Sequence, residues 1–150
     1  MFNRFMERTP PNKAGVIIKL GNKILLTHAT NSSWRVRPFS IPKGAIETGE
    51  SEEEAALREL YEEVGITLNP EVLGQPQSVV LYSSQGKPIA TLTYFIVEIN
   101  STYDIGLDRE VLPKSMLQLE EVDWAGFITI DEAYSTINQA QIIMLDRIRG

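Results

Sequence analysis

Apolar residues occur along the chain in short runs that are separated by turn residues. Residues 14–20 and 23–27 are β-rich runs, and Gly21-Asn22 between them is a two-residue connection typical of a β-hairpin. Residues 78–83 and 89–97 form a second pair of such runs. The pattern therefore predicts two pairs of β-strands.

The end of the chain predicts one more strand followed by a helix. Residues 124–130 are rich in β-formers, Asp131 is a candidate N-cap, and a helical pattern continues toward Leu145. Asn138 is a candidate break that would divide this helix into two. Strand pairs combined with helices indicate a mixed α/β protein in which helices cover a sheet.

A helix over residues 51–64 is expected between the two strand pairs. It begins with the S-x-x-E spacing of a capping box, from Ser51 to Glu54, and Gly65 follows it as a candidate C′ residue. At ~100° per residue, the helix has one apolar face and one acidic face. The apolar face carries Leu57, Leu60 and Val64, and the acidic face carries Glu59, Glu62 and Glu63.

The acidic face conflicts with the ordinary rules of helix stability. Glu59 and Glu63 are a like-charged i,i+4 pair, which is unfavourable by ~0.2–0.5 kcal/mol. Glu62 and Glu63 also lie near the helix C-terminus, where the macrodipole favours cations. A hard divalent cation with oxygen ligands would turn this repulsion into coordination, so the pattern indicates Mg²⁺. Taken alone, a run of glutamates like this is more typical of a solvated face on an amphipathic helix.

The spacing around this helix resembles the signature of the Nudix hydrolases. That signature is Gly, five residues, Glu, seven residues, Arg-Glu, an aliphatic, any residue, Glu-Glu, any residue, Gly and an aliphatic. The chain matches it at Gly44, Glu50, Arg58, Glu59, Leu60, Glu62, Glu63, Gly65 and Ile66.

The resemblance implies a fold and a reaction. The fold is of the α/β class, a Nudix-type α/β/α sandwich with a mixed sheet. The reaction is hydrolysis of a phosphoanhydride in a nucleoside diphosphate linked to another moiety, with Mg²⁺ or Mn²⁺ as cofactor. The family has no single fixed general base, so the resemblance leaves open which glutamate deprotonates the water.

The resemblance also implies roles for individual residues. Glu59, Glu62 and Glu63 would be metal ligands or the base, and the Gly44 carbonyl would be a further ligand. The remaining implied roles belong to Arg58 and Glu50, which brace the loop against the helix, and to Gly49, which shapes the turn.

Composition narrows the class of protein. The 150 residues are 43% hydrophobic, which suits a single domain over residues 1–150. Cysteine is absent, so a metal would be bound through oxygen. The net charge of −6 argues against a long nucleic acid as partner and favours a small nucleotide. No apolar run approaches the ~18 residues of a membrane span, and the amino terminus lacks a signal-peptide pattern, so a cytoplasmic protein is expected.

The substrate side resembles the Nudix members that act on diadenosine polyphosphates. The shared features are the Pro42-Lys43 entry to the motif, the Trp124 strand that leads into Asp131-Glu132-Ala133, and Lys87 before residues 93–95. A dinucleoside polyphosphate such as diadenosine tetraphosphate is therefore the first expectation. Hydrolysis of nucleoside triphosphates or nucleoside diphosphate sugars is an alternative. A module that senses a nucleotide without hydrolysing it is an alternative from another class.

The residues before the motif supply candidates for substrate binding. Lys43 could hold a phosphate that the metal does not reach, or it could be a solvated lysine. Arg35 and Arg37 could clamp phosphates, and Trp34 could stack on a base. Alternatively, Trp34 could cover the edge of the sheet.

Further candidates lie outside this segment. Tyr82 and Tyr94 could stack on a purine or pack against the sheet, and Lys87 is a third candidate for substrate binding. Glu120 lies where some family members place an additional metal-binding or base carboxylate. His28 is the sole histidine, and we expect no catalytic role for it.

Overall fold

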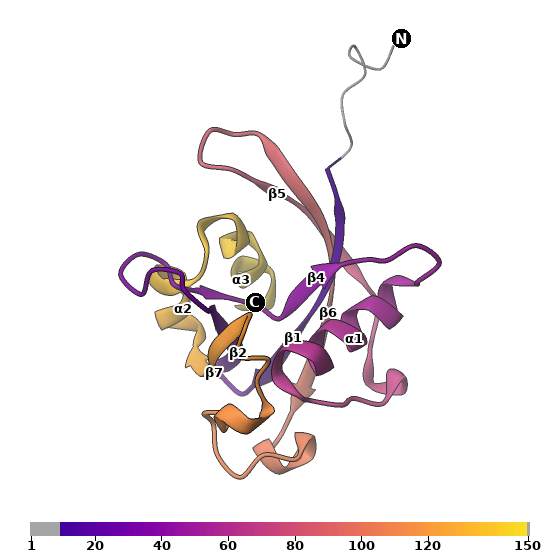
Figure 1. Ribbon diagram of the computed structural model, residues 1–150, viewed down its shortest axis with the longest axis vertical. Coiled ribbons are helices and arrows are strands. Elements are labelled where there is room, and N and C mark those ends of the chain that lie inside the picture. The colour runs from indigo at the N-terminus through magenta and orange to yellow at the C-terminus, as the bar shows by residue number, and fades with distance from the viewer. Residues whose placement is uncertain (1–9, 150) are drawn as a thin grey trace.

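The computed structural model describes residues 10–149, where seven strands form one mixed sheet (Figure 1). The strands are β1 (Asn12–Leu20), β2 (Lys23–Ala29), β3 (Phe39–Ser40), β4 (Lys43–Ala45), β5 (Gln77–Tyr82), β6 (Pro88–Ile99) and β7 (Val122–Thr129). Their order is β3-β2-β1-β6-β5, with β4 paired to β1 and β7 paired to β2. β1 and β6 are parallel, and the other strand pairings are antiparallel.

Helices cover both faces of this sheet (Figure 1). α1 (Glu52–Val64) packs on one face, and α2 (Ile130–Thr136) and α3 (Ile142–Arg149) pack on the other. Short 3₁₀ helices lie in the connections, namely η2 (Pro70–Val72), η3 (Thr102–Ile105), η4 (Lys114–Met116) and η5 (Gln139–Gln141). The expected α/β/α sandwich with a mixed sheet is confirmed.

A hydrophobic core lies on each side of the sheet because successive side chains of a strand point to opposite faces. In β1, Val16 and Ile18 pack in the core that contains α1, whereas Ile17 packs in the core that contains α2 and α3. In β6, Phe95 packs in the core that contains α1, and Tyr94 packs in the core that contains α2 and α3. Burial on both faces explains why these strands are continuous apolar runs in the sequence.

The ends of α1 form as the sequence predicts. The Ser51 hydroxyl accepts a hydrogen bond from the Glu54 amide at 3.1 Å, and the Glu54 carboxylate accepts one from the Ser51 amide at 2.8 Å. Gly65 ends the helix in the left-handed conformation, with φ of 72°. The capping box and the C-terminal glycine are therefore confirmed.

The central strands diverge at the place where a site can form. β1 and β2 pair directly only at Lys19–Ile24 and Leu20–Lys23, beside their turn. Farther along, β1 pairs with β4, while β2 pairs with β3 and β7. The segment that carries β3 and β4 therefore crosses from one half of the split sheet to the other.

The carboxyl-terminal part differs from the expectation in one detail. The N-cap of α2 is Thr129, whose hydroxyl accepts from the Glu132 amide, so the assignment of Asp131 as N-cap is wrong. Asp131 instead lies in the first turn, where its negative charge also suits the helix dipole. The break at Asn138 is confirmed, since Asn138 caps η5 and α3 follows as a separate helix. In residues 10–149, each helix is too short or too polar to cross a membrane.

Candidate functional site

The acidic face of α1 points away from the core that Leu60 and Val64 enter. Both of these apolar residues are fully buried. The Glu59 side chain is 13% exposed and the Glu62 side chain is 55% exposed, while Glu63 is half-buried. The helical spacing thus presents three carboxylates with different degrees of contact with water.

Arg58 links the acidic face to the loop that precedes α1. Its Nε and Nη2 donate to the two oxygens of Glu50 at 2.6 and 2.9 Å, and Nη2 also donates to the Ala45 carbonyl at 2.9 Å. Its Nη1 donates to Glu59 at 2.9 Å and to Glu62 at 3.1 Å. One guanidinium therefore fixes the loop and orients two carboxylates.

This ion pair also changes the proton affinity of its members. Hydrogen bonds from Arg58 lower the pKa of Glu50 to about 2, with help from the Glu47 amide. The same contact with Glu50 raises the pKa of Arg58 further above its ordinary value. Because the pKa of Glu50 is lowered, the stabilisation that it supplies is present above pH 4.5 and is lost as the pH falls toward 2.

Glu63 differs from Glu50 in that its pKa is raised rather than lowered. Burial raises the pKa of Glu63 to about 8, and the charge of Glu59 adds to the effect, whereas the charge of Lys43 opposes it. The pKa of Lys43 is lowered, first by burial and then by Lys13, although Glu63 and Glu59 act against that change. In the protein without a bound cation, negative charge on Glu63 is thus poorly compensated.

Gly44 provides the space into which Glu59 fits. Gly44 lies in β4, which pairs antiparallel with the first half of β1. A Cβ at Gly44 would overlap the carboxylate of Glu59. The absence of a side chain therefore lets a carboxylate lie directly against the backbone of β4.

These groups fit a hard divalent cation in their chemistry. In residues 10–149, no three carboxylate or histidine side chains are close enough together to enclose a metal by themselves. Arg58 binds Glu59 and Glu62 instead. Mg²⁺ is commonly held by one or two carboxylates together with water and substrate phosphates, so a closed protein cage is not required. The oxygen donors and the unfavourable charge on Glu63 are suited to such an ion.

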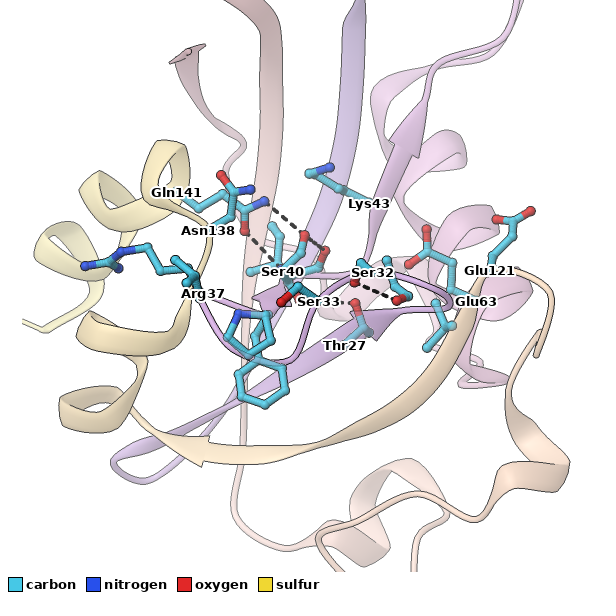
Figure 2. A pocket seen from close by; sticks show the side chains of 16 residues that line it. Thr27, Ser32, Ser33, Arg37, Ser40, Lys43, Glu63, Glu121, Asn138 and Gln141 are labelled. Atoms are coloured by element: carbon cyan, nitrogen blue, oxygen red, sulfur yellow. Dashed lines mark hydrogen bonds between the residues drawn. The ribbon is translucent and has the colours of Figure 1, made fainter. Parts of the chain in front are cut away.

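A cavity of about 390 Å³ adjoins the acidic face at the split in the sheet. Its lining combines residues of β2, β3 and the loop before β3 with Lys43, Glu63, Glu121, Asn138 and Gln141. Figure 2 shows Glu63 and Glu121 at one end of the cavity and Asn138 and Gln141 at the other. A ligand in this cavity would therefore extend from amide side chains to the carboxylates.

The amide end of the cavity is held together by hydrogen bonds. Gln141 is buried; its Oε1 accepts from the Ile41 amide at 3.0 Å, and its Nε2 donates to the Ser40 hydroxyl at 2.9 Å. Asn138 is exposed, and its Oδ1 accepts from the Ala140 amide at 3.0 Å. Within residues 10–149, the amide nitrogen of Asn138 makes no hydrogen bond, which leaves a donor at this end.

Arg37 lines the cavity, but its guanidinium binds backbone carbonyls at the end of α2. Its Nη1 donates to the carbonyls of Tyr134 and Ile137 at 2.9 and 3.1 Å, at the end of α2. A cation at this position satisfies free carbonyls and interacts favourably with the helix dipole. The prediction that Arg37 clamps phosphates is corrected, since the side chain points toward the helices (Figure 2).

Trp34 covers one end of β2. Its indole stacks on the ring of His28 at 3.7 Å and meets Trp124 edge-on. His28 is fully buried, and its Nδ1 lies 2.6 Å from the Asp123 carboxylate. Neither Trp34 nor the exposed Arg35 lines the cavity, so the arrangement matches the structural alternative for Trp34.

The two tyrosine candidates also lie outside the cavity. Tyr94 is fully buried in the core beside α3, and its hydroxyl donates to Gln77 at 3.1 Å, so its prediction as a base-stacking residue is wrong. Tyr82 and Lys87 flank the turn between β5 and β6, are exposed, and do not line the cavity. Of the candidates for substrate contact, only Lys43 lies in the cavity with a charged group that makes no hydrogen bond or ion pair within residues 10–149.

Of the two acids before β7, Glu121 is the one that lines the cavity. Both Glu120 and Glu121 are exposed, but only Glu121 contributes to the raised pKa of Glu63. Glu120 stays a prediction as a metal-binding or base carboxylate, and Glu121 is a second candidate. The pair of acids before β7 was a usable signal, but only the structure shows which of them lines the cavity.

Three polar residues at the amide end of the cavity had no assigned role in the sequence. These are Ser40, Asn138 and Gln141. The break in a helical pattern at Asn138 is a local signal, but Gln141 bonds Ser40 and Ile41, which lie about a hundred positions away in the chain.

The chain is similar to known proteins over most of its length. The model of the NUDIX domain family matches residues 9–143. The chain is 32% identical over 113 residues to the asymmetrical bis(5'-nucleosyl)-tetraphosphatase of Caenorhabditis elegans, which covers 72% of this chain and 79% of that protein. A segment of 53 residues is 42% identical to 8-oxo-dGTP diphosphatase of Escherichia coli (strain K12), covering 35% of this chain and 41% of that protein.

Solved structures share the fold. A MutT NUDIX hydrolase from Burkholderia pseudomallei superimposes with a TM-score of 0.67 at 19% identity, covering 94% of this chain and 99% of that chain. A binary complex of the C. elegans Ap4A hydrolase gives a TM-score of 0.64 at 24% identity, covering 93% of this chain and 95% of that chain.

Proposed function

The chain belongs to the NUDIX family, and from this premise we propose that it hydrolyses a phosphoanhydride bond in a dinucleoside polyphosphate such as diadenosine tetraphosphate. The observation that carries the proposal is the position of Glu63, which belongs to the acidic face of α1 and also lines the cavity. A nucleoside in the cavity would direct its phosphates toward the carboxylates.

Hydrolases of this family generally use divalent metal ions. We propose Mg²⁺ or Mn²⁺, held by Glu59, Glu62 and Glu63 with the Gly44 carbonyl as a further ligand. When bound, such an ion would neutralise phosphate charge and lower the pKa of an attacking water. The half-buried and poorly compensated position of Glu63, and the space that Gly44 leaves for Glu59, support this assignment.

Different side chains around this site accept the proton, position the carboxylates and bind phosphate. One of the three glutamates accepts the proton of the attacking water, which needs a carboxylate within hydrogen-bonding reach. Arg58 positions Glu59 and Glu62, and Glu50 in turn positions Arg58. Lys43, which lines the same cavity as Glu63, supplies a cation for a phosphate beyond the carboxylates.

Arg58→Lys is expected to lower turnover by about 10–100-fold, the usual cost of losing a residue that orients ligands. A lysine ammonium cannot form the forked contact with Glu50 while also reaching Glu59. Steady-state kinetics would measure the loss, with a thermal unfolding curve to verify folding. Arg35→Lys is the matched control, because Arg35 is exposed and outside the cavity. Equal activity in the two variants would refute the positioning role of Arg58.

The choice of substrate rests on the cavity and on the relatives. At the end away from the carboxylates, the cavity offers the amide nitrogen of Asn138, which has no hydrogen-bond partner among residues 10–149 and to which a base could bond as acceptor. The C. elegans tetraphosphatase matches most of this chain. The E. coli diphosphatase matches only a third of it, so a nucleoside triphosphate is the second candidate.

A panel of nucleotides with identified products tests the proposal. With Mg²⁺ or Mn²⁺, diadenosine tetraphosphate is expected to yield a nucleoside triphosphate and a monophosphate. Preferred release of pyrophosphate from a triphosphate would move the assignment to triphosphates, and a sugar phosphate with a mononucleotide would move it to nucleotide sugars. Measurable binding with no product from any substrate would identify a nucleotide-sensing module instead.

A further inference from the structure

A second hollow lies beside the acidic face of α1, at the end of the helix that carries Tyr61 and Gly65. This hollow, of about 550 Å³, is lined by Tyr61, Glu62, Gly65, Ser115, Met116, Gln118 and Glu121. Glu121 lines both this hollow and the cavity described above. The two spaces therefore meet at Glu121, and the carboxylates lie between them.

The wall of the second hollow is fixed against the end of α1. The amide of Gln118 donates to the Glu63 carbonyl at 3.1 Å, which satisfies one of the free carbonyls at the helix end. At Gly65, a Cβ would lie 2.8 Å from the Met116 carbonyl, so the two segments are in close contact. Backbone contacts with the end of α1 therefore fix the wall of the hollow.

Tyr61 is the aromatic surface in this hollow. It is 60% exposed, whereas the core-facing residues of α1 such as Leu60 and Val64 are fully buried. Within residues 10–149, its hydroxyl makes no hydrogen bond, so neither core packing nor a polar contact accounts for its position. An exposed aromatic ring beside the reacting groups can stack on a base.

The charge of the hollow indicates which chemical group it would accept. Its lining includes the carboxylates of Glu62 and Glu121, and no lysine or arginine of residues 10–149 belongs to it. Arg58 offsets the charge of Glu62 at 3.1 Å, but the lining offers a terminal phosphate or pyrophosphate no cation from residues 10–149, and an uncharged nucleoside needs none. Among nucleotides, a dinucleoside polyphosphate places a nucleoside on each side of its phosphate chain.

We propose that the hollow beside Tyr61 binds the second nucleoside of a dinucleoside polyphosphate, with the Tyr61 ring stacked on its base. The proposal rests on the function proposed above, and it makes Tyr61 the residue that distinguishes dinucleotides from substrates with one nucleoside. Ser115 and Gln118 offer polar side chains around the same ligand.

Two substrates that differ only in the second nucleoside provide the test. Tyr61→Ala is expected to lower kcat/KM for diadenosine tetraphosphate by about ten-fold more than kcat/KM for adenosine 5'-tetraphosphate. Tyr61→Phe keeps the ring and is expected to restore the preference for the dinucleotide. Tyr103→Ala removes a tyrosine that is 74% exposed in η3, outside both spaces, and is the matched control.

The outcomes separate this proposal from the proposed function. An equal effect of Tyr61→Ala on both substrates, or no effect on either, would overturn the second subsite while hydrolysis continues. If the unsubstituted protein hydrolyses neither substrate, the proposed function fails, and calorimetric binding of a methylene-bridged dinucleotide analogue then decides the subsite. Unchanged affinity for that analogue in Tyr61→Ala would overturn it, and an affinity weakened about ten-fold, restored in Tyr61→Phe, would support it.

Discussion

Glu63→Gln is expected to lower turnover by roughly 10²–10⁴-fold, the range that a positioned proton acceptor contributes. The amide keeps the volume of the side chain but can neither carry the negative charge nor accept the proton. Glu62→Gln is expected to lower turnover by a similar factor, because it removes charge from the same face of α1. Steady-state kinetics at saturating Mg²⁺ would measure both effects.

The same substitution is expected to stabilise the protein in the absence of metal. Burial and the charge of Glu59 raise the pKa of Glu63 to about 8, from 4.5 in the ordinary case. Between these two values the folded state holds a proton that the unfolded state has released, so stability falls as the pH rises from 4.5 to 8. Glu63→Gln has no such dependence. Its melting temperature should therefore exceed that of the unsubstituted protein by a margin that grows up to pH 8 and then stays constant.

Glu53→Gln is the matched control for both measurements. Glu53 is exposed in the first turn of the same helix and does not line the cavity. Its substitution should change turnover by less than about two-fold and should leave the pH dependence of the melting temperature as it was. Near-normal turnover in both Glu62→Gln and Glu63→Gln would contradict the proposed hydrolysis.

Gly44→Ala is expected to lower turnover by about 10²-fold or more and to weaken the binding of Mn²⁺. The new methyl group would overlap the Glu59 carboxylate, which would have to leave its position against β4. Displacement of a ligating or catalytic group by about an ångström is enough for a loss of this size. Calorimetric titration with Mn²⁺ and steady-state kinetics would measure the two effects.

Gly74→Ala controls for the general effect of adding a methyl group to a glycine. A Cβ at Gly74, in the connection between η2 and β5, would meet no atom within 4 Å. The backbone of neither glycine is left-handed, so both alanine variants should fold. If Gly44→Ala bound Mn²⁺ and hydrolysed substrate as well as Gly74→Ala does, the space that Gly44 leaves for the Glu59 carboxylate would have no functional importance.

Most features of the acidic helix could be predicted from the spacing of residues within that helix. Neighbours three and four apart share a helix face, so Glu59, Glu62 and Glu63 could be grouped, and Ser51 and Gly65 placed at the ends, without any tertiary information. The contact of Arg58 with Glu62 follows from the same spacing. The whole α/β/α sandwich was also within reach, because the strands are continuous apolar runs and the loop-helix spacing resembles one family.

The substrate side shows where local pattern ends. Tyr94 and Tyr82 are both tyrosines of paired strands, yet one is fully buried and the other is half exposed. Arg37 was assigned to phosphates from its charge, but it binds carbonyls at Ile137, 100 positions along the chain. Glu120 and Glu121 are identical in kind, and only the direction in which the chain enters β7 distinguishes them.

The sequence by itself determined the acidic face, its caps and the oxygen chemistry of the site, because these depend on residues within a few turns of one helix. Only the tertiary structure decided the cavity, the place of Glu121 in its lining and the hollow beside Tyr61. Those features arise where β1 and β2 diverge and where distant segments pack against the end of α1. Contacts between residues about a hundred positions apart leave no periodic trace in the chain, and so they become visible only after folding.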